Sequence, residues 1–305
     1  MKFSVIITLY NKAPYIARTL RSVIRQSKAA AQIVIVDDVS TDNSLQVVRQ
    51  TLEAEADWLQ HTEVNIIERE HNGGPGAARN TAIKEVTGDY VFLLDGDDEY
   101  KPGVFERAES VFSKYDPAIF FLQFEQDPNG RQLPNIAGLS EVTEELEPDV
   151  LGIPNLIAAF GHDNFGMMGS TVGCKRMVLD HGFYEENLNC FEGLEFWYRA
   201  ARYMEKFSGT ALLLAGVSVT FHLTQNSVSR KKVADGGEIY LPLQFKQFRH
   251  SQDRDVQKLR KRIFTIWMRN AQLKAPNWQQ KLWFYWQYRR PIVSNLWLNF
   301  RFGMR

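Results

Sequence analysis

The chain has 305 residues, of which 44% are hydrophobic and 24% charged, and this favours one large globular domain or one domain with an appendage. Because 36 Lys and Arg residues balance 36 Asp and Glu residues, the net charge points to no class of partner. No run approaches the roughly 20 apolar residues that cross a bilayer, and the N-terminal residues lead directly into a strand pattern rather than a secretory leader.

Short apolar runs alternate with helical patterns in the first part of the chain. Strands are predicted where β-branched and apolar residues run together without a polar face, at 3–9, 32–38, 63–69 and 89–95. The segments between them have helical spacing, capping residues or a glycine turn with proline, and predict helices near 15–24, 40–54 and 71–86. This alternation predicts an α/β fold with a doubly wound, mostly parallel sheet and helices on both faces.

The pattern is less regular after residue 117. We predict a strand at 118–126, loops with short helices at 126–165, a strand and a short helix within 169–186, a helix at 192–207 and one or two strands within 210–223. From about Lys231 the pattern becomes helical. The expected organisation is therefore a domain at 1–230, with halves at 1–115 and 116–230, and a helical region at 231–305.

Polar motifs follow the predicted strands of the first half. Tyr10-Asn11, Asp37-Asp38, Asn72-Gly73-Gly74 and Asp95 to Asp98 each come directly after an apolar run. In open α/β sheets, ligands bind beyond the carboxyl ends of the strands. These motifs are therefore expected to meet at one edge of the sheet and to form a binding site there.

The stretch YVFLLDGDDEY, residues 90–100, runs from a buried strand into four acids. In extended geometry Asp95 and Asp97 point to the same side, and Gly96 between them permits a close approach of backbone or ligand. Clustered carboxylates suit a divalent cation such as Mg²⁺ or Mn²⁺ that is shared with substrate phosphates. The alternative is a solvated acidic turn without a ligand.

Taken together, SVIITLYNKAPYIARTLRSVIRQS, IVIVDDVSTDNS, NGGPGAARNTAI and GDYVFLLDGDDEYKPG resemble the family 2 inverting glycosyltransferases of GT-A fold. The resemblance covers residues 1–115 and continues more loosely to about residue 230. It implies an enzyme that uses a nucleotide-sugar donor and a divalent cation, Mn²⁺ or Mg²⁺.

The resemblance also implies roles for individual residues. Thr8 and Tyr10 match the pocket for the nucleotide base, and Asp38 matches the residue that hydrogen-bonds the pyrimidine ring, which favours UDP- or dTDP-type donors. Helix capping is the alternative role for Asp37 and Asp38. Arg79 is expected to neutralise the diphosphate or to pair with the acidic turn.

In the acidic turn, the resemblance implies that Asp95 contacts the ribose or diphosphate and that Asp97 binds the metal directly. Asp98 is then an alternative metal ligand or lies in the outer coordination sphere. The glycines at 73 and 74 allow close approach of the backbone, and the helix that follows them favours an anion at its N-terminus. A purely structural tight turn is the alternative for these glycines.

An inverting transfer needs a general base near the acceptor hydroxyl. The family supplies it from a Glu-Asp pair that opens a later helix, and this chain has CFEGLEFWYRA, in which Gly193 stands where the aspartate is expected. The expected base is Glu192, with Glu195 one turn later as the second candidate; capping or surface acids are the alternative. Downstream, His222 is either a ligand of the diphosphate or metal, or a structural histidine.

The C-terminal region is basic and aromatic. From Arg254 to Arg305 there are twelve Lys or Arg and one Asp, and five of the seven tryptophans fall there. Such helices suit peripheral contact with an anionic membrane, and packing on the domain or homo-oligomerisation is the alternative. No nucleic-acid-binding motif is recognisable, so nucleic acid is not expected as a partner.

The expected function is transfer of a sugar from a nucleotide diphosphate to a hydroxyl of a glycan or lipid-linked acceptor for a bacterial surface polysaccharide. A non-catalytic sugar-nucleotide or glycan-binding module that has lost the base is the alternative, and a nucleotidyltransferase lacks its basic glycine-rich signature here. Two cysteines, at 174 and 190, form no metal or disulfide pattern, so we expect a cytoplasmic protein, with contact at the inner membrane face.

Overall fold

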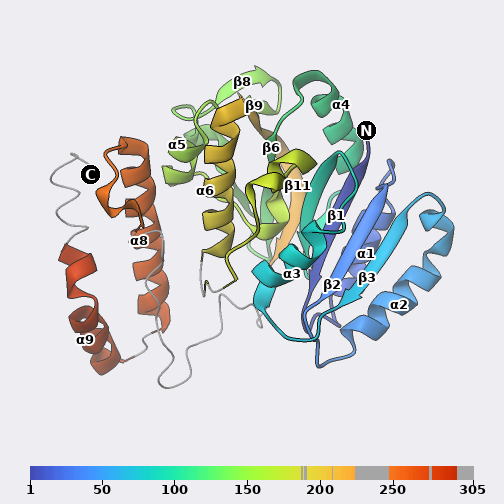
Figure 1. Cartoon of the computed structure of the whole chain (residues 1–305), viewed down its shortest axis with the longest axis horizontal. Helices are drawn as coiled ribbons and strands as arrows, with labels where there is room; N and C mark the ends of the chain where they lie inside the picture. The colour runs from blue at the N-terminus through green and yellow to red at the C-terminus, as the bar shows by residue number, and fades with distance from the viewer. Residues whose placement is uncertain (187, 189–190, 208, 224–246, 275–276, 294–305) are drawn as a thin grey trace.

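The computed structural model describes residues 1–186, 188, 191–207, 209–223, 247–274 and 277–293. Its centre is a mixed sheet in which the strands lie in the order β3-β2-β1-β4-β10-β6-β11-β9-β8, with β5 paired to β11 and β7 paired to β6 (Figure 1). The strands are β1 (Phe3–Leu9), β2 (Gln32–Asp37), β3 (Glu63–Glu68), β4 (Tyr90–Asp95), β5 (Glu99–Tyr100), β6 (Ile119–Asp127), β7 (Arg131–Leu133), β8 (Glu144–Glu147), β9 (Val150–Gly152), β10 (Val172–Lys175) and β11 (Ala211–His222).

Helices cover both faces of this sheet. They are α1 (Ile16–Ile24), α2 (Ser44–Ala54), α3 (Gly74–Ile83), α4 (Val104–Tyr115), α5 (Leu156–Gly161), α6 (Glu192–Met204), α8 (Arg254–Lys274) and α9 (Trp278–Gln287). The predicted α/β fold is therefore confirmed, including its mostly parallel sheet with helices on both faces.

The two faces of the sheet form separate hydrophobic clusters because strand side chains alternate. In β4, Phe92 belongs to the cluster that packs against α1, α2 and α4, whereas Leu93 belongs to the cluster that packs against α3, α5 and α6. Both residues are buried, which explains why the strand has no polar face in the sequence.

The second half of the chain completes the same sheet. Strand β10 runs antiparallel between β4 and β6, and β11 lies parallel to β6 with a register shift between Leu214 and Val219. The antiparallel strands β8 and β9 lie within 126–165, where only loops and short helices were predicted, so that prediction was incomplete. Strand β8 has the sequence EELE and is mostly exposed at the sheet margin, so it has no hydrophobic alternation to recognise.

Two parts of the C-terminal region are described, and the predicted boundary near Lys231 lies outside the described residues. Helix α8 packs on α5 through buried Val256, Leu259 and Ile263, and Arg262 donates to the carbonyl oxygens of Phe160 and Phe165 at 2.7 and 2.6 Å. In the described part of the chain, no helix is long and apolar enough to span a bilayer.

Phe120 tests the aromatic core between β4, β6 and α4. Its ring centre lies 4.7 Å from those of Phe92 and Phe112 and 6.3 Å from that of Tyr90. We expect Phe120→Ala to lower the free energy of unfolding by about 3–5 kcal/mol, because the cavity left between the sheet and α4 cannot collapse fully. Denaturant unfolding measures the change.

The matched control is Phe207→Ala, which removes a ring that is 56% exposed. A surface truncation of this kind is expected to change the free energy of unfolding by no more than about 0.5 kcal/mol. Equal effects of the two substitutions would contradict the assignment of Phe120 to the core.

Candidate active site

The register of the parallel strands brings the first strand-end motifs together. Thr8 of β1 is paired with Asp95 of β4, and Leu9 is paired with Asp37 of β2. The Thr8 hydroxyl donates a hydrogen bond of 3.0 Å to Asp95 Oδ1. The prediction that these motifs meet at one edge of the sheet is confirmed.

The acidic segment after β4 is a turn. The Asp98 N–H donates to the Asp95 carbonyl at 3.0 Å, so Asp95 and Asp97 are not on one extended strand, and the predicted extended geometry was wrong. The turn brings Gly96 against β1, where its N–H donates to the Thr8 carbonyl oxygen at 3.0 Å. Glycine is needed at position 96 because a Cβ there would lie 2.9 Å from the same oxygen.

Each acid of this turn has its own partner. The Asp97 carboxylate forms an ion pair with the Lys12 ammonium, and Arg18 Nη2 donates to the Asp97 carbonyl at 3.2 Å. Lys12 lies in the YNKAP turn that follows β1. Lys12 was not among the predicted site residues, although its place directly after the Tyr10-Asn11 motif was a signal for it.

Asp98 is the most buried of the four acids, with 1% of its surface exposed. It accepts hydrogen bonds from the Ser170 hydroxyl and, at 3.0 Å, from the His222 N–H. Burial, reinforced by the nearby Asp95 carboxylate, raises the pKa of Asp98 well above its usual value. These surroundings anchor the turn to β11. Among the aspartates of the motif, Asp95 is the most accessible, with 29% of its side chain exposed against 12% for Asp97.

His222, at the end of β11, joins the acidic turn to β6. Its Nε2 lies 2.7 Å from Glu99 Oε1, and its Nδ1 lies 3.0 Å from Asp127 Oδ2. Both ring nitrogens therefore have carboxylate partners. Of the two roles considered for His222, these contacts favour the structural one.

Arg79 of α3 links Asp95 of the acidic turn to Glu192, at the start of α6. Its guanidinium is 4% exposed and donates to Asp95 Oδ1 at 2.8 Å, while Nη1 lies 3.9 Å from Glu192 Oε1. Burial opposes the charge on Arg79, but Asp95 and other neighbours more than compensate, so its pKa is raised above the ordinary value. A Cβ at Gly169 would lie 2.3 Å from Arg79 Nη2, so this glycine allows the chain to close over the pair.

The two candidate bases, Glu192 and Glu195, have different neighbours. Glu192 begins α6, is partly exposed, and lies beside Arg79 and the first turn of α3. Glu195 is buried and forms a bidentate ion pair with Arg199 at 2.6 and 2.9 Å. Of the two, Glu192 is the one that lies beside the strand-end motifs.

Asp38 holds the glycine turn that begins α3. Its carboxylate pairs with Arg69 and accepts the N–H groups of Gly73, at 3.0 Å, and Gly74, at 2.7 Å. The carboxylate therefore fills the anion position at the N-terminus of α3 that was predicted for a ligand. The Gly73 N–H also lies 3.3 Å from Oδ2, so these contacts use the roughly four acceptor positions of the carboxylate, and Asp38 is only 3% exposed. Tyr10, predicted for the same base pocket, is 36% exposed after β1.

A divalent cation fits these residues only in part. In the described ranges, no three or more His, Cys, Asp or Glu side chains are arranged to hold a metal ion by themselves. Mg²⁺ is commonly held by one or two carboxylates together with substrate phosphates. Asp95 and Asp97 are suited to that kind of shared site, in which the substrate completes the ligand set.

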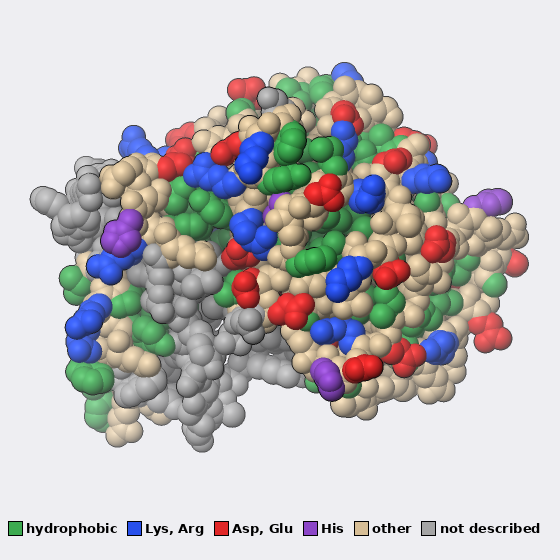
Figure 2. All heavy atoms as spheres, in the orientation of Figure 1, with side chains coloured by type: hydrophobic (Ala, Val, Ile, Leu, Met, Phe, Trp, Pro, Cys, Tyr) green, Lys and Arg blue, Asp and Glu red, His purple; other side chains and the backbone are tan. Residues whose placement is uncertain are grey.

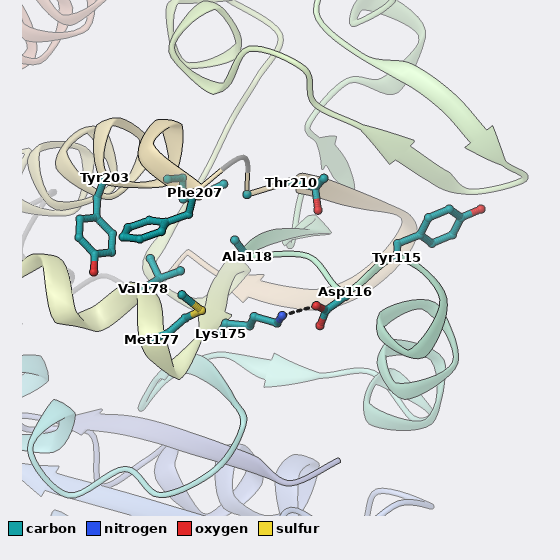
Figure 3. Close-up of a pocket in the computed structure, with 11 residues that line it drawn as sticks. Tyr115, Asp116, Ala118, Lys175, Met177, Val178, Tyr203, Phe207 and Thr210 are labelled. Atoms are coloured by element: carbon teal, nitrogen blue, oxygen red, sulfur yellow. Dashed lines mark hydrogen bonds and ion pairs between the residues drawn. The ribbon is translucent and has the colours of Figure 1, made fainter.

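A surface hollow lies near the start of β4, at the opposite end of this strand from the acidic turn. Figure 3 shows Lys175 of β10 directed at Asp116, with Met177 beside Lys175 and with Phe207 next to Tyr203 farther along the hollow. Lys175 is paired in register with Tyr90, at the start of β4, whereas the acidic turn follows the end of β4. This hollow is therefore separate from the strand-end site.

Comparison with known proteins identifies a family. The model of the family described as glycosyl transferase family 2 matches residues 4–181. An uncharacterized glycosyltransferase of a Nostoc species is 40% identical over 116 residues, which is 38% of this chain and 34% of that protein. The poly(ribitol-phosphate) beta-N-acetylglucosaminyltransferase TarS of Staphylococcus aureus is 32% identical over 153 residues, 49% of this chain and 24% of that protein. The chain thus spans about a quarter to a third of the length of these relatives.

Solved structures share the fold. TarS residues 1–349 of S. aureus in complex with UDP-GlcNAc superpose with a TM-score of 0.62 at 20% identity, over 89% of this chain and 72% of that chain. A mannosyltransferase from Pyrobaculum calidifontis in complex with GDP-Man and Mn²⁺ has a TM-score of 0.57 at 16% identity, over 97% and 84%. Similarity at this level concerns the fold.

Gly96→Ala tests the geometry of the acidic turn. The added Cβ would meet a backbone oxygen, so the turn has to shift, and we expect a loss of about 1–3 kcal/mol in the free energy of unfolding. We also expect the thermal stabilisation by Mn²⁺ and UDP together to be lost. Differential scanning fluorimetry measures both effects.

The matched control is Gly193→Ala, where an added Cβ meets nothing within 4 Å and lies in a helix. This variant is expected to be as stable as the parent or up to about 1 kcal/mol more stable. If Gly96→Ala behaved in the same way, the close approach to Thr8 would not constrain the turn.

Proposed function

We propose that this chain, which belongs to glycosyl transferase family 2, transfers a sugar from a nucleotide diphosphate to a hydroxyl of a glycan acceptor, with inversion at the sugar. The observation that carries the proposal is the position of Arg79, which contacts Asp95 of the acidic turn and lies beside Glu192. A donor-side acid and a candidate base thus lie on two sides of one buried cation.

The donor is proposed to be a UDP-sugar bound beyond the ends of β1, β2 and β4. The edge carries Thr8, the exposed Tyr10 and, at the start of α3, Asp38; a hydroxyl, an aromatic ring and a carboxylate suit a ribose and a pyrimidine ring. The S. aureus relative whose structure contains UDP-GlcNAc supports a uridine nucleotide. Nucleoside diphosphate release from a panel of nucleotide sugars identifies the sugar that is transferred.

The diphosphate is proposed to lie beside Asp95 and Asp97, with a divalent cation between them. When bound, Mn²⁺ or Mg²⁺ would neutralise the negative charge that grows on the leaving diphosphate. Lys12 forms an ion pair with Asp97, and Arg79 forms one with Asp95. They hold the acids in position and offset their mutual repulsion before the donor arrives.

Glu192 is proposed to accept the proton of the acceptor hydroxyl as that oxygen attacks the sugar from the side opposite the diphosphate. Its partial exposure at the start of α6 suits a group that has to meet the acceptor. Glu195 is already paired with Arg199, and this favours a structural role for it.

The acceptor is proposed to be a glycan or a lipid-linked glycan of a bacterial surface polymer. Relatives carry names of this kind, including a poly(ribitol-phosphate) beta-glucosyltransferase of Bacillus spizizenii, 35% identical over 49% of this chain. Gly193 still supports the alternative of a non-catalytic binding module, because the family aspartate is missing there. A cation-dependent transfer assay separates the two.

Asp97→Asn tests the cation site. The amide oxygen can still accept from Lys12, but the charge of the ion pair is lost, so we expect a small fall in melting temperature in the presence of EDTA. We also expect loss of Mn²⁺-dependent transfer and of the Mn²⁺-induced rise in melting temperature. Transfer is measured as release of nucleoside diphosphate from a panel of nucleotide sugars with an acceptor present.

Glu68→Gln is the control for Asp97→Asn. It removes an acid that ends β3 at the same edge of the sheet, is 55% exposed and pairs with Arg49. Its transfer activity should equal that of the parent. Normal metal-dependent turnover of Asp97→Asn would show that the cation is held elsewhere.

Glu192→Gln and Glu195→Gln form a pair that separates catalysis from structure. We expect Glu192→Gln to lower kcat about a hundredfold to ten-thousandfold with little change in donor affinity, because the proton acceptor is removed. Glu195→Gln is expected to keep most of kcat and to lose about 1–2 kcal/mol of stability, because the charged hydrogen bonds to Arg199 are weakened.

Steady-state kinetics and denaturant unfolding of both variants measure these effects. The opposite pattern, in which Glu195→Gln abolishes turnover while Glu192→Gln does not, would move the base to Glu195. Absence of nucleoside diphosphate release by the parent protein with every donor and acceptor tried would favour the binding module.

A further inference from the structure

Helix α9 presents two different sides. On one side, Phe284 is buried, with its ring centre 5.2 Å from that of Trp267 on α8. On the other side, Trp278 and Trp286 are each 67% exposed and Leu282 is 59% exposed. Since α8 in turn packs on α5, α9 is held at the outside of the molecule, where Figure 1 shows it at the lower left.

The exposed apolar side chains form one stripe. Trp278, Leu282 and Trp286 are spaced four residues apart, so they lie one above the other on the helix, and Tyr285, 40% exposed, lies beside them. We call these four residues the α9 face. Adjacent large apolar side chains at this exposure mark a surface that meets a partner or a membrane.

The charge around the α9 face has one sign. Lys281, Arg289 and Arg290 are exposed, and the Arg289 guanidinium stacks over the Trp286 ring at 4.7 Å from its centre. The sequence contains no Asp or Glu from residue 256 to residue 293. Figure 2 shows Lys or Arg side chains beside hydrophobic ones at the lower left, over α9, without acidic ones among them.

We infer that the α9 face binds an anionic lipid bilayer, with the helix lying in the headgroup region. Tryptophan and leucine on one side of a helix, flanked by lysine and arginine, match the chemistry of an interfacial helix. A second copy of this chain fits less well, because a symmetric contact through the α9 face would set the same cations against one another. The inference does not depend on the proposed reaction.

Vesicle co-sedimentation of the full chain tests this inference. We expect binding to vesicles of phosphatidylcholine mixed with phosphatidylglycerol, weakening as salt is added, and no binding to phosphatidylcholine alone. Each cation near the surface contributes about fivefold to the affinity, so reversing Lys281, Arg289 and Arg290 to Glu should lower it by at least about a hundredfold. Trp278→Ala with Trp286→Ala should also abolish binding.

Two control variants match these changes. Trp58→Ala removes a tryptophan that is 55% exposed in the short turn after α2, at the other end of the molecule in Figure 1. Lys2, Arg49 and Lys114 replaced by Glu reverse three exposed charges on other elements. Both controls should bind the anionic vesicles as the parent does, and all variants should keep the parent circular dichroism spectrum.

Three results would overturn the inference. The first is equal binding to neutral and anionic vesicles, or no binding to either. The second is binding that survives the loss of both tryptophans or the reversal of the three charges. The third is a concentration-dependent dimer, seen by light scattering, that the two tryptophan substitutions dissociate while vesicle binding is unchanged.

Discussion

The buried guanidinium of Arg79 is the constraint on which the site depends. An arginine keeps its charge at any ordinary pH, so at 4% exposure it has to be paired or it would destabilise the fold. Asp95 supplies the pairing from the end of β4, and Glu192 adds a second carboxylate from α6. Through this one side chain, α3, the acidic turn and the later helix are held at fixed positions, with Gly169 allowing the chain to pass directly over the pair. Substitution at any of these positions is therefore expected to disturb the others.

The acidic turn shows how one short segment can carry several carboxylates near pH 7. Asp97 is paired with Lys12, Glu99 lies beside His222, and Asp98 is buried with hydrogen bonds from Ser170 and the His222 backbone. These partners come from the β1–α1 turn, from η3 (Gly169–Thr171) and from β11, so the turn is also where the two halves of the chain are joined. Stability and the proposed chemistry thus use neighbouring acids of the same motif for different purposes.

The C-terminal region packs on the domain through α8, and we infer that it meets a membrane through α9. Helix α8 is part of the folded domain, because its apolar residues are buried against α5 and Arg262 binds carbonyl oxygens of the segment that follows it. Helix α9 is attached through Phe284 and Trp267 and leaves its tryptophan stripe exposed. The inferred bilayer contact would hold the strand-end site close to the proposed lipid-linked acceptor.

The sequence by itself determined the α/β fold, the parallel first half and the edge at which the polar motifs meet, because apolar runs, glycine turns and strand ends are local signals. It also identified Asp95, Arg79 and Glu192 as neighbours of one site, although only through a family resemblance. The contacts of Lys12, Arg69 and Ser170 with the acids, the turn at Gly96 and the separation of Glu192 from Glu195 were decided by tertiary structure. These contacts depend on which side chains from distant segments reach the same carboxylate. No periodic pattern in the sequence marks an ion pair between residues 85 apart, such as Lys12 with Asp97.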